Sequence, residues 1–246
     1  TTALSVQLYT IREALEADAS GALARVAELG FRRVEPFGMV DRADEYERLL
    51  PAAGLSAPSA HTSIVGRELN EILDVAARLG VGTVIEPAVH ADRWQDRSSV
   101  LRIADELNTA AAAARASGIA VGYHNHWWEF EASFDGIPAY EVFAAHLDPA
   151  VVLEVDTYWA TVAGVPAAGL LERLGSRVGL IHVKDGDISR DNTRQVGVGS
   201  GRMPVLEILA AAPDAVRVVE LDDFDGEVFD ALADSVAFLT ANGERL

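Results

Sequence analysis

Four short stretches of sequence decide the fold: ELGFRRV (28–34), AAGLSAP (52–58), RLGVGTV (78–84) and ASGIAVG (116–122). Each closes an alanine- and leucine-rich amphipathic segment at a glycine and then opens a short apolar run. Glycine ends helices in this way because it adopts the left-handed conformation without a steric cost. The same helix-to-strand junction is predicted at Gly30, Gly54, Gly80, Gly118 and Gly175.

Outward from these junctions, the chain alternates short apolar runs with amphipathic segments. Short apolar runs bounded by turn residues are typical of buried parallel strands, and apolar residues three and four apart are typical of helices. The predicted strands are Leu4–Tyr9, Arg33–Pro36, Ser56–His61, Thr83–Pro87, Ala120–Asn125, Val151–Asp156, Gly179–Lys184 and Val216–Asp222. The clearest predicted helices are Ala22–Leu29, Leu69–Leu79, Val100–Ala116, Tyr140–His146, Val205–Ala211 and Phe229–Leu239.

Eight strands that alternate with helices predict one closed α/β barrel, a (β/α)8 TIM barrel, as a single domain over residues 1–246. The alternative is an open doubly wound sheet. That fold would normally carry a glycine-rich turn after its first strand, whereas Thr10-Ile11-Arg12-Glu13 follows Tyr9 here. The sequence therefore favours the barrel.

The composition excludes several classes of function. The 246 residues carry a formal net charge of −18 and no lysine- or arginine-rich run, which argues against nucleic-acid binding. The absence of cysteine excludes disulfides, thiolate metal sites and cysteine nucleophiles. No apolar stretch has the length of a transmembrane helix and the N-terminus lacks a signal-peptide pattern, so we expect a soluble, cytoplasmic protein without membrane association.

Polar residues gather at the predicted strand ends, where the loops of a TIM barrel form its active face. Five of the six histidines fall at these ends or just beyond them, and only His146 lies in a predicted helix. The strand-end candidates are Tyr9, Glu35, His61, Glu86, His90, His124, His126, Glu154, Asp156, His182, Lys184, Glu220 and Asp222.

The two-residue period of a strand places side chains two apart on the same face. Four adjacent strands can then direct one metal-binding side chain each toward a common point, and the set we predict is His124, Asp156, His182 and Glu220. Nitrogen and carboxylate ligands suit Mn, Co, Zn, Mg or Fe. Each residue alone has a simpler explanation, because a strand-end histidine is often only hydrogen-bonded and Asp156 or Asp222 can cap the next helix.

Several longer motifs resemble the xylose isomerase-like TIM-barrel superfamily, and most closely its bacterial sugar phosphate isomerase/epimerase proteins. They are QLYTIR (7–12), VEPFG (34–38), YHNHWWEF (123–130), LEVDTYW (153–159), GLIHVKDGD (179–187), VGVGSG (196–201) and VVELDDF (218–224). The resemblance covers essentially the whole chain. The order of these motifs along the chain is specific for the superfamily but much less specific for the reaction.

The resemblance implies a four-ligand divalent metal site, and Asp156, His182 and Glu220 match its last three positions. His124 stands at the first position, where ketose 3-epimerases carry glutamate, which puts a symmetric two-carboxylate mechanism in doubt. Glu129 is the alternative fourth ligand or base. Glu220 would remove a proton beside a carbonyl to form an enediolate, and His124 could handle the second proton transfer if it is not a ligand. Lys184 could protonate or polarise an oxygen of the substrate.

The expected function is that of a divalent-metal-dependent sugar isomerase/epimerase with a small carbohydrate as substrate. A lyase acting on a keto-inositol or 3-keto-glycoside is the close alternative, since elimination needs one base on carbon. A non-catalytic sugar-binding or partner subunit also remains possible, as does a homo-oligomer, while the charge argues against a metal-dependent endonuclease.

Lys184 could form a salt bridge with Asp185 or Glu154 instead of acting on the substrate. The residues expected to contact substrate are Glu35, His61, His90, Trp94, His126, Trp127 and Tyr158. Core packing is the simpler explanation for each of the aromatic residues.

Overall fold

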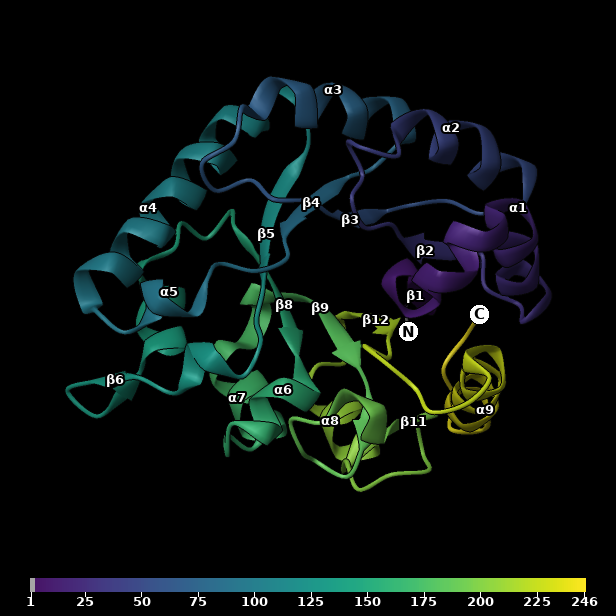
Figure 1. The fold of residues 1–246 in the computed structure, drawn as a ribbon. Helices are drawn as coiled ribbons and strands as arrows, with labels where there is room; N and C mark the ends of the chain where they lie inside the picture. The colour runs from purple at the N-terminus through teal and green to yellow at the C-terminus, as the bar shows by residue number, and fades with distance from the viewer. Residues whose placement is uncertain (1–2) are drawn as a thin grey trace.

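The barrel strands are short, parallel and arranged around a common axis (Figure 1). The computed structural model describes residues 3–246, and the order of its eight-stranded sheet is β2-β1-β12-β9-β8-β5-β4-β3. The strands are β1 (Ser5–Gln7), β2 (Arg33–Glu35), β3 (Ser59–His61), β4 (Thr83–Glu86), β5 (Ala120–His124), β8 (Val152–Asp156), β9 (Val178–Val183) and β12 (Val216–Val219).

The seam between β2 and β3 nearly closes the barrel. The backbone N–H of Val34 donates to Ser56 (2.9 Å), and that of His61 donates to Pro36 (2.8 Å). These contacts form isolated parallel bridges rather than a continuous ladder. The predicted TIM barrel is confirmed, because the two outermost strands of the sheet meet each other instead of facing solvent as they would in an open sheet.

Helices cover the outside of the barrel (Figure 1). They are α1 (Arg12–Glu28), α2 (Ala43–Ala52), α3 (Leu69–Leu79), α4 (Arg97–Ala114), α5 (Ala139–His146), α6 (Thr157–Val162), α7 (Ala167–Leu174), α8 (Val205–Ala211) and α9 (Val228–Ala241). The bounds of α3 and α8 coincide with the predicted ones. Among the described residues, none of these helices combines the length and the apolar character needed to span a membrane.

Helix α1 extends ten residues further toward the N-terminus than the helix predicted from Ala22. The backbone leaves helical geometry at Asp18 (φ −157°, ψ 89°), and its carboxylate accepts a hydrogen bond from Gly21 N–H (3.0 Å). Asp18 thus acts as a cap inside a kinked helix. The sequence pattern detected only the part after this kink.

The interior of the barrel changes from apolar to charged along the axis. A small cluster of Ile85, Leu180 and Val218 fills one end, supported by Val152 and Val216. Because side chains alternate along each strand, the inward residues after Leu180 and Val152 are His182 and Glu154. The barrel therefore uses an apolar layer as the base for a buried polar layer at the carboxyl ends of its strands.

Candidate metal centre and substrate cavity

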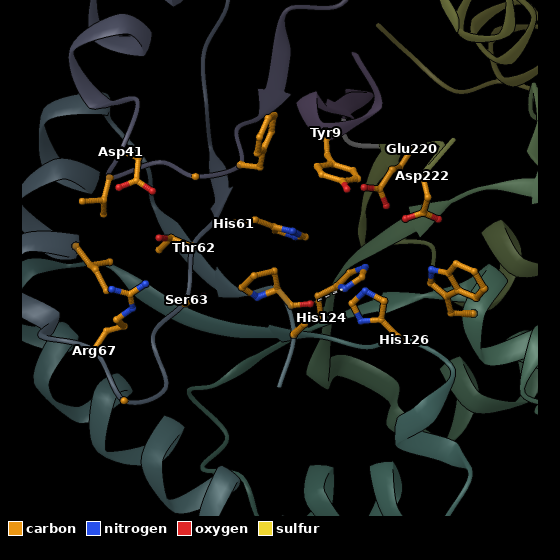
Figure 2. Close-up of a pocket in the computed structure, with 18 of the residues that line it drawn as sticks. Tyr9, Asp41, His61, Thr62, Ser63, Arg67, His124, His126, Glu220 and Asp222 are labelled. Atoms are coloured by element: carbon orange, nitrogen blue, oxygen red, sulfur yellow. Dashed lines mark hydrogen bonds between the residues drawn. The ribbon is translucent and has the colours of Figure 1, made fainter. Parts of the chain in front are cut away.

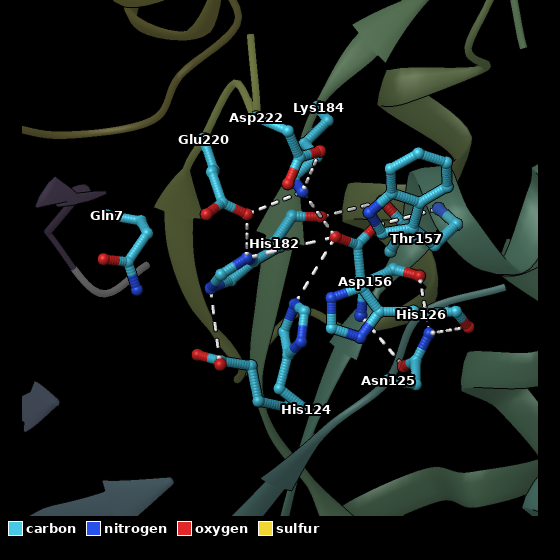
Figure 3. Close-up of polar contacts among 12 residues, drawn as sticks. Gln7, His124, Asn125, His126, Asp156, Thr157, His182, Lys184, Glu220 and Asp222 are labelled. Carbon is cyan, nitrogen blue, oxygen red and sulfur yellow. Dashed lines mark hydrogen bonds and ion pairs between the residues drawn. The ribbon is translucent and has the colours of Figure 1, made fainter. Parts of the chain in front are cut away.

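Four side chains converge at the carboxyl ends of β5, β8, β9 and β12 (Figure 3). They are His124, Asp156, His182 and Glu220, all buried, and one potential ligand atom from each lies within 4.8 Å of the others. Strand register produces this convergence, because β8 and β9 pair Asp156 with His182, and β9 and β12 pair His182 with Val218, two residues before Glu220. The structure thus brings together the four residues that the sequence predicts as ligands.

The tautomer of His124 leaves one ring nitrogen free. Its Nδ1 lies 3.2 Å from the carbonyl oxygen of Pro87, to which it donates. Its Nε2 is buried without a hydrogen-bond partner and lies 3.4 Å from Asp156 Oδ2. A histidine that donates through one nitrogen to a backbone carbonyl presents the lone pair of the other, which is how metal-binding histidines are oriented.

Asp156 fulfils two roles with its two oxygens. Oδ1 accepts a hydrogen bond from Trp159 N–H (2.8 Å) and caps helix α6. Oδ2 is paired with the ammonium of Lys184 (2.8 Å) and lies on the side of the four-residue cluster, 3.4 Å from His124 Nε2. Both readings of this residue, the helix cap and the ligand, therefore fit the same side chain.

His182 lies between two groups of carboxylates. Its Nδ1 is 2.7 Å from Glu220 Oε2, on the side of the four-residue cluster. Its Nε2 is 2.9 Å from Glu35 Oε1 and 3.3 Å from Glu154 Oε2, deeper in the barrel. This second set also includes His61, whose Nε2 is 2.6 Å from Glu154 Oε2 and 3.1 Å from Glu35 Oε1.

Lys184 is the only lysine in the sequence, and its side chain is fully buried. Its Nζ lies 2.8 Å from Asp156 Oδ2, 2.6 Å from Glu220 Oε2 and 2.8 Å from Asp222 Oδ2. The expected partners, Asp185 and Glu154, are wrong, because the alternation of β9 and the loop after it turns Asp185 away. A compact ammonium fits among three carboxylates where the larger, planar guanidinium of arginine would not.

Charge controls the ionisation of this cluster more than burial does. Burial alone would lower the pKa of His182 and of Lys184, but the adjacent carboxylates raise both well above their usual values. Burial would raise the pKa of Asp156 and of Glu220, but Lys184 and the histidines lower both. In the absence of a metal, the site is thus a network of carboxylates neutralised by an ammonium and by imidazolium protons.

The residues present fit a divalent cation. The free Nε2 of His124, Oδ2 of Asp156, Nδ1 of His182 and Oε2 of Glu220 form a mixed nitrogen and oxygen donor set. Each carboxylate oxygen has more than one lone pair, so Lys184 and a cation can share the same oxygens. Such donors suit Zn, Mn, Co or Fe, and binding would release the extra proton of His182.

A cavity of about 990 Å³ opens directly above this cluster (Figure 2). Its walls come from the loops after several strands, as expected for the active face of a TIM barrel. Among the predicted site residues, His61, His124, His126, Trp127 and Glu220 line it. The ring of His126 stacks on Trp128, with centroids 4.1 Å apart, and its Nδ1 has no hydrogen-bond partner.

Four of the residues expected to contact substrate lie outside the cavity lining, namely His90, Trp94, Tyr158 and Glu35. The side chain of His90 is 78% exposed and caps a short helix through Asp92 N–H. Trp94 is fully buried against Tyr123 and Phe143, with its Nε1 donating to Val89 O (3.3 Å). We therefore assign neither a substrate contact.

The other two of these four residues lie behind the cavity surface. Tyr158 is buried, and its hydroxyl group is 3.2 Å from both the backbone N and O of Ser189. Glu35 is also fully buried and reaches the site only through His61 and His182. Both residues support the site from outside the cavity.

Glu129 is not part of the four-residue cluster. One carboxylate oxygen accepts from the Tyr123 hydroxyl (2.9 Å), and the other accepts from His126 N–H (2.9 Å). Its complete burial raises its pKa to about 8. The geometry thus favours His124 over Glu129 as the fourth ligand and gives Glu129 the task of holding the loop that carries His126.

The loop after β9 is fixed by a single carboxylate that the sequence pattern did not identify. Asp185 accepts hydrogen bonds from the backbone N–H groups of Gly186, Gly199, Gly201 and Met203. A side chain at Gly201 would collide with this carboxylate. The VGVGSG stretch was the available signal, since closely spaced glycines indicate a backbone that approaches another group closely.

The same loop supports Lys184 through Gln195. The Gln195 amide donates to Asp222 Oδ2 (2.7 Å) and accepts from Asp222 N–H (2.7 Å). Asp222 in turn pairs with Lys184. These contacts connect the glycine-rich loop to the charged cluster and keep Asp222 at the edge of the cavity.

A parallel barrel with ionisable side chains gathered above the carboxyl ends of its strands is the arrangement of a TIM-barrel enzyme. The chain belongs to the xylose isomerase-like TIM barrel family, whose model matches residues 23–241. The family expected from the sequence motifs is therefore confirmed. The sequence has no match among curated proteins.

Solved structures with the same fold include proteins of several descriptions. A sugar phosphate isomerase/epimerase from Parabacteroides distasonis is 26% identical, with a TM-score of 0.82 over 98% of this chain and 94% of that chain. A probable 3-DHS dehydratase, AsbF from Bacillus anthracis, is 13% identical, with a TM-score of 0.74 over 97% and 99% of the two chains. The IolI protein, with a bound zinc atom, is 15% identical, with a TM-score of 0.67 over 98% and 96%.

Proposed function

We propose that this protein is a divalent-metal-dependent sugar isomerase/epimerase that removes a proton next to a carbonyl. The observation that carries the proposal is the convergence of His124, Asp156, His182 and Glu220 at the closed end of a large cavity. When bound there, the cation would supply Lewis-acid stabilisation of negative charge developing on the oxygens of the sugar. The family membership and the isomerase/epimerase description of a 26% identical structure support this class.

Glu220 is the residue we assign as the base. It lines the cavity, and its Oε2 is held by both His182 (2.7 Å) and Lys184 (2.6 Å), which keep the carboxylate ionised and fixed in orientation. Lys184 does not line the cavity, so we assign it the positioning of Glu220 and Asp156 rather than direct proton transfer. A general base must be both ionised and within reach of the substrate, and Glu220 meets both conditions.

His126 is the residue we assign to the second proton transfer, in place of His124. Both histidines line the cavity, but His124 would hold the cation through its free Nε2. The Nδ1 of His126 has no partner, and the ring is stacked on Trp128. Trp127 and Trp128 add the aromatic surface that suits the apolar face of a sugar ring.

A lyase reaction is the second candidate, and Asp222 is the observation that favours it. This carboxyl group also lines the cavity, beside Glu220, and the two share the ammonium of Lys184. A base and an acid on the same side of a sugar suit the removal of a proton and the departure of a β-substituent. The dehydratase among the structures of the same fold is consistent with this chemistry.

The proposed function is tested by metal content and by proton exchange. Purified protein is analysed for bound metals, and keto-sugars are incubated with it in D2O while the carbon-bound hydrogens are followed by NMR. We expect about one equivalent of Mn, Co, Zn or Fe that is lost in His182→Ala and His124→Ala. We expect hydrogen–deuterium exchange next to the carbonyl that Glu220→Gln abolishes.

His90→Ala is the control, because it removes an exposed histidine outside the cavity. It should retain the metal and the exchange. Exchange accompanied by loss of a β-substituent would select the lyase. A metal-free wild-type protein that exchanges no hydrogen would contradict both reactions and leave a sugar-binding subunit.

A further inference from the structure

The cavity extends well beyond the proposed metal centre. Its inner end contains His124, His126, Glu220 and Asp222, whereas Asp41, Thr62, Ser63 and Arg67 lie on the opposite side of His61 (Figure 2). We call this second region the outer lobe, and its polar lining consists of Asp41, Thr62, Ser63, Arg67, Glu68 and Glu71. The loops after β2 and β3, together with the first turn of α3, provide these residues.

The whole cavity is larger than one sugar ring requires. Its volume of about 990 Å³ lies at the upper end of the roughly 300–1,000 Å³ range of pockets that enclose drug-sized ligands. A single hexose is considerably smaller than such a ligand. A monosaccharide bound at the metal centre would therefore leave the outer lobe filled only by water.

The polar side chains of the outer lobe have no partners within the protein. In residues 3–246, the side chains of Asp41, Arg67 and Glu71 form no hydrogen bond or ion pair, and neither do those of Thr62, Ser63 and Glu68. A second groove, which Arg42 and Arg78 line, adjoins the outer lobe. Unlike Arg67, both of these arginines form ion pairs with carboxylates. Arg42 contacts Glu16 and Glu45, and Arg78 contacts Asp44 and Glu47.

We propose that the outer lobe binds a second, uncharged sugar ring, so that the substrate is a disaccharide or similar glycoside rather than a sugar phosphate. This inference rests on the proposed function of the metal centre. Carboxylates accept hydrogen bonds from sugar hydroxyl groups, and Arg67, Thr62 and Ser63 supply the donors. The lobe thus offers both halves of a sugar-binding surface, on a wall continuous with the reaction site.

The charge of the lobe excludes a phosphate. The lining of the lobe contains three acidic residues, Asp41, Glu68 and Glu71, and one basic residue, Arg67, so a phosphate would meet more negative than positive charge there. Arg190 is the other arginine in the cavity lining, and it is engaged with Glu131 (2.8 Å) and with the face of Trp127 (3.5 Å). No pair of free arginines is available here to hold a phosphate in the usual bidentate manner.

The test compares ligands of one and two rings on the metal-loaded protein. Saturation-transfer NMR and titration calorimetry are carried out with three keto-disaccharides (lactulose, maltulose and isomaltulose), with fructose and with fructose 6-phosphate. We expect at least one disaccharide to receive saturation in both rings and to bind about ten-fold more tightly than either monosaccharide, which is about 1.4 kcal/mol. In the Asp41→Ala/Arg67→Ala double variant, its affinity should fall to that of fructose, while fructose binding stays unchanged.

Arg78→Ala is the matched control, because it removes an arginine from the neighbouring groove outside this cavity. It should leave the disaccharide affinity unchanged. Saturation confined to the ketose ring, tighter binding of fructose 6-phosphate, or no binding of any disaccharide would each overturn the two-ring proposal. Those results are distinct from failure of the proposed function, which is seen as absent metal and absent hydrogen exchange whichever sugar binds.

Discussion

The Nε2 of His182 lies 2.9 Å from Oε1 of Glu35, a carboxylate that belongs to β2 on the far side of the barrel. Glu35 is itself held by Gln7 (2.9 Å), by the hydroxyl group of Ser59 and by His61. Because Nε2 donates to Glu35, Nδ1 is the nitrogen left for a cation. The orientation of a proposed ligand is thus fixed in part by Glu35, Gln7 and Ser59, which do not line the cavity.

Replacing Glu35 with glutamine should weaken metal binding without removing a ligand. With its amide oxygen facing His182, glutamine accepts less strongly than the carboxylate, and its NH2 group cannot accept from the hydroxyl group of Ser59. We expect the metal dissociation constant to rise by about 10–100-fold, as for other partners of metal-bound histidines. Competition with a chelator measures the constant, and circular dichroism verifies the fold.

Glu86→Gln is the control for this variant. Glu86 is an equally buried carboxylate at the end of β4, but it accepts from the backbone N–H groups of Ile64 and Val65 (both 2.7 Å). The Glu86→Gln variant should reduce the stability of the protein with little effect on its affinity for metal. Equal losses of affinity in both variants would contradict a specific role for Glu35.

Replacing Lys184 with methionine should destabilise the metal-free protein and increase its response to metal. The change leaves Asp156, Glu220 and Asp222 without their shared ammonium, and loss of one partner from a buried charge cluster costs about 3–5 kcal/mol. Urea unfolding in the presence of EDTA measures this cost. Added Mn²⁺ or Zn²⁺ should restore more stability to the variant than it adds to the wild type.

Arg78→Met provides a matched control on the surface. Arg78 also contacts two carboxylates, but its side chain is 43% exposed, so its loss should cost much less stability than the loss of Lys184. Lys184 also allows a direct check, because selective ¹⁵N-lysine labelling gives one side-chain signal from the only lysine. An unchanged signal on metal addition would contradict a cation beside Asp156 and Glu220.

Replacing Asp185 with asparagine should loosen the loop over residues 186–203. One of the two oxygens that accept backbone N–H groups becomes an NH2 group, which leaves two of those donors without an acceptor. Since a hydrogen bond to a charged acceptor contributes about 1.5–3 kcal/mol, we expect a loss of about 3 kcal/mol or more. Urea unfolding measures the loss, and hydrogen exchange should accelerate at Gly199, Gly201 and Met203.

Asp187→Asn is the control, since Asp187 is partly exposed and lies 3.6 Å from its partner Arg194. It should change stability little. If Asp185→Asn kept full protection of these amides, the loop would have another anchor.

The sequence predicted the barrel because its signals are local and repeated. The glycine at each junction and the apolar spacing of α3 and α8 depend only on neighbours in the chain, so their bounds were found. Strand period likewise placed Glu154 and Asp156 on one face. The structure places both inside the barrel, where Asp156 joins one cluster and Glu154 the other.

The sequence could not show which residues meet across the barrel. Glu35 and His182 are 147 positions apart, and nothing local indicates that their side chains touch. The sequence also does not show the direction of loop side chains. His90 and Trp94 both lie in the loop after β4, yet His90 faces solvent and Trp94 is buried in the core. The nearest charge to Lys184 in sequence, Asp185, was also a misleading partner, since adjacent residues point to opposite sides.

Glu129 should make the stability of the protein decrease as the pH rises from about 4.5 to about 8. Its pKa is raised from 4.5 to about 8 by burial, so the folded protein retains a proton that the unfolded chain loses between these values. Stability from this group is therefore complete below about pH 4.5, falls as pH rises, and is lost above about pH 8, with a slope of up to about 1.4 kcal/mol per pH unit. Glutamine keeps the shape of the side chain and cannot ionise, so Glu129→Gln should flatten the dependence of stability on pH between pH 5 and 8.

Urea unfolding of the wild type and of Glu129→Gln, at steps of half a pH unit, measures this dependence. A wild-type slope that survives in Glu129→Gln would mean that the titrating group lies elsewhere, and that the carboxyl group beside Tyr123 is already ionised in the folded protein.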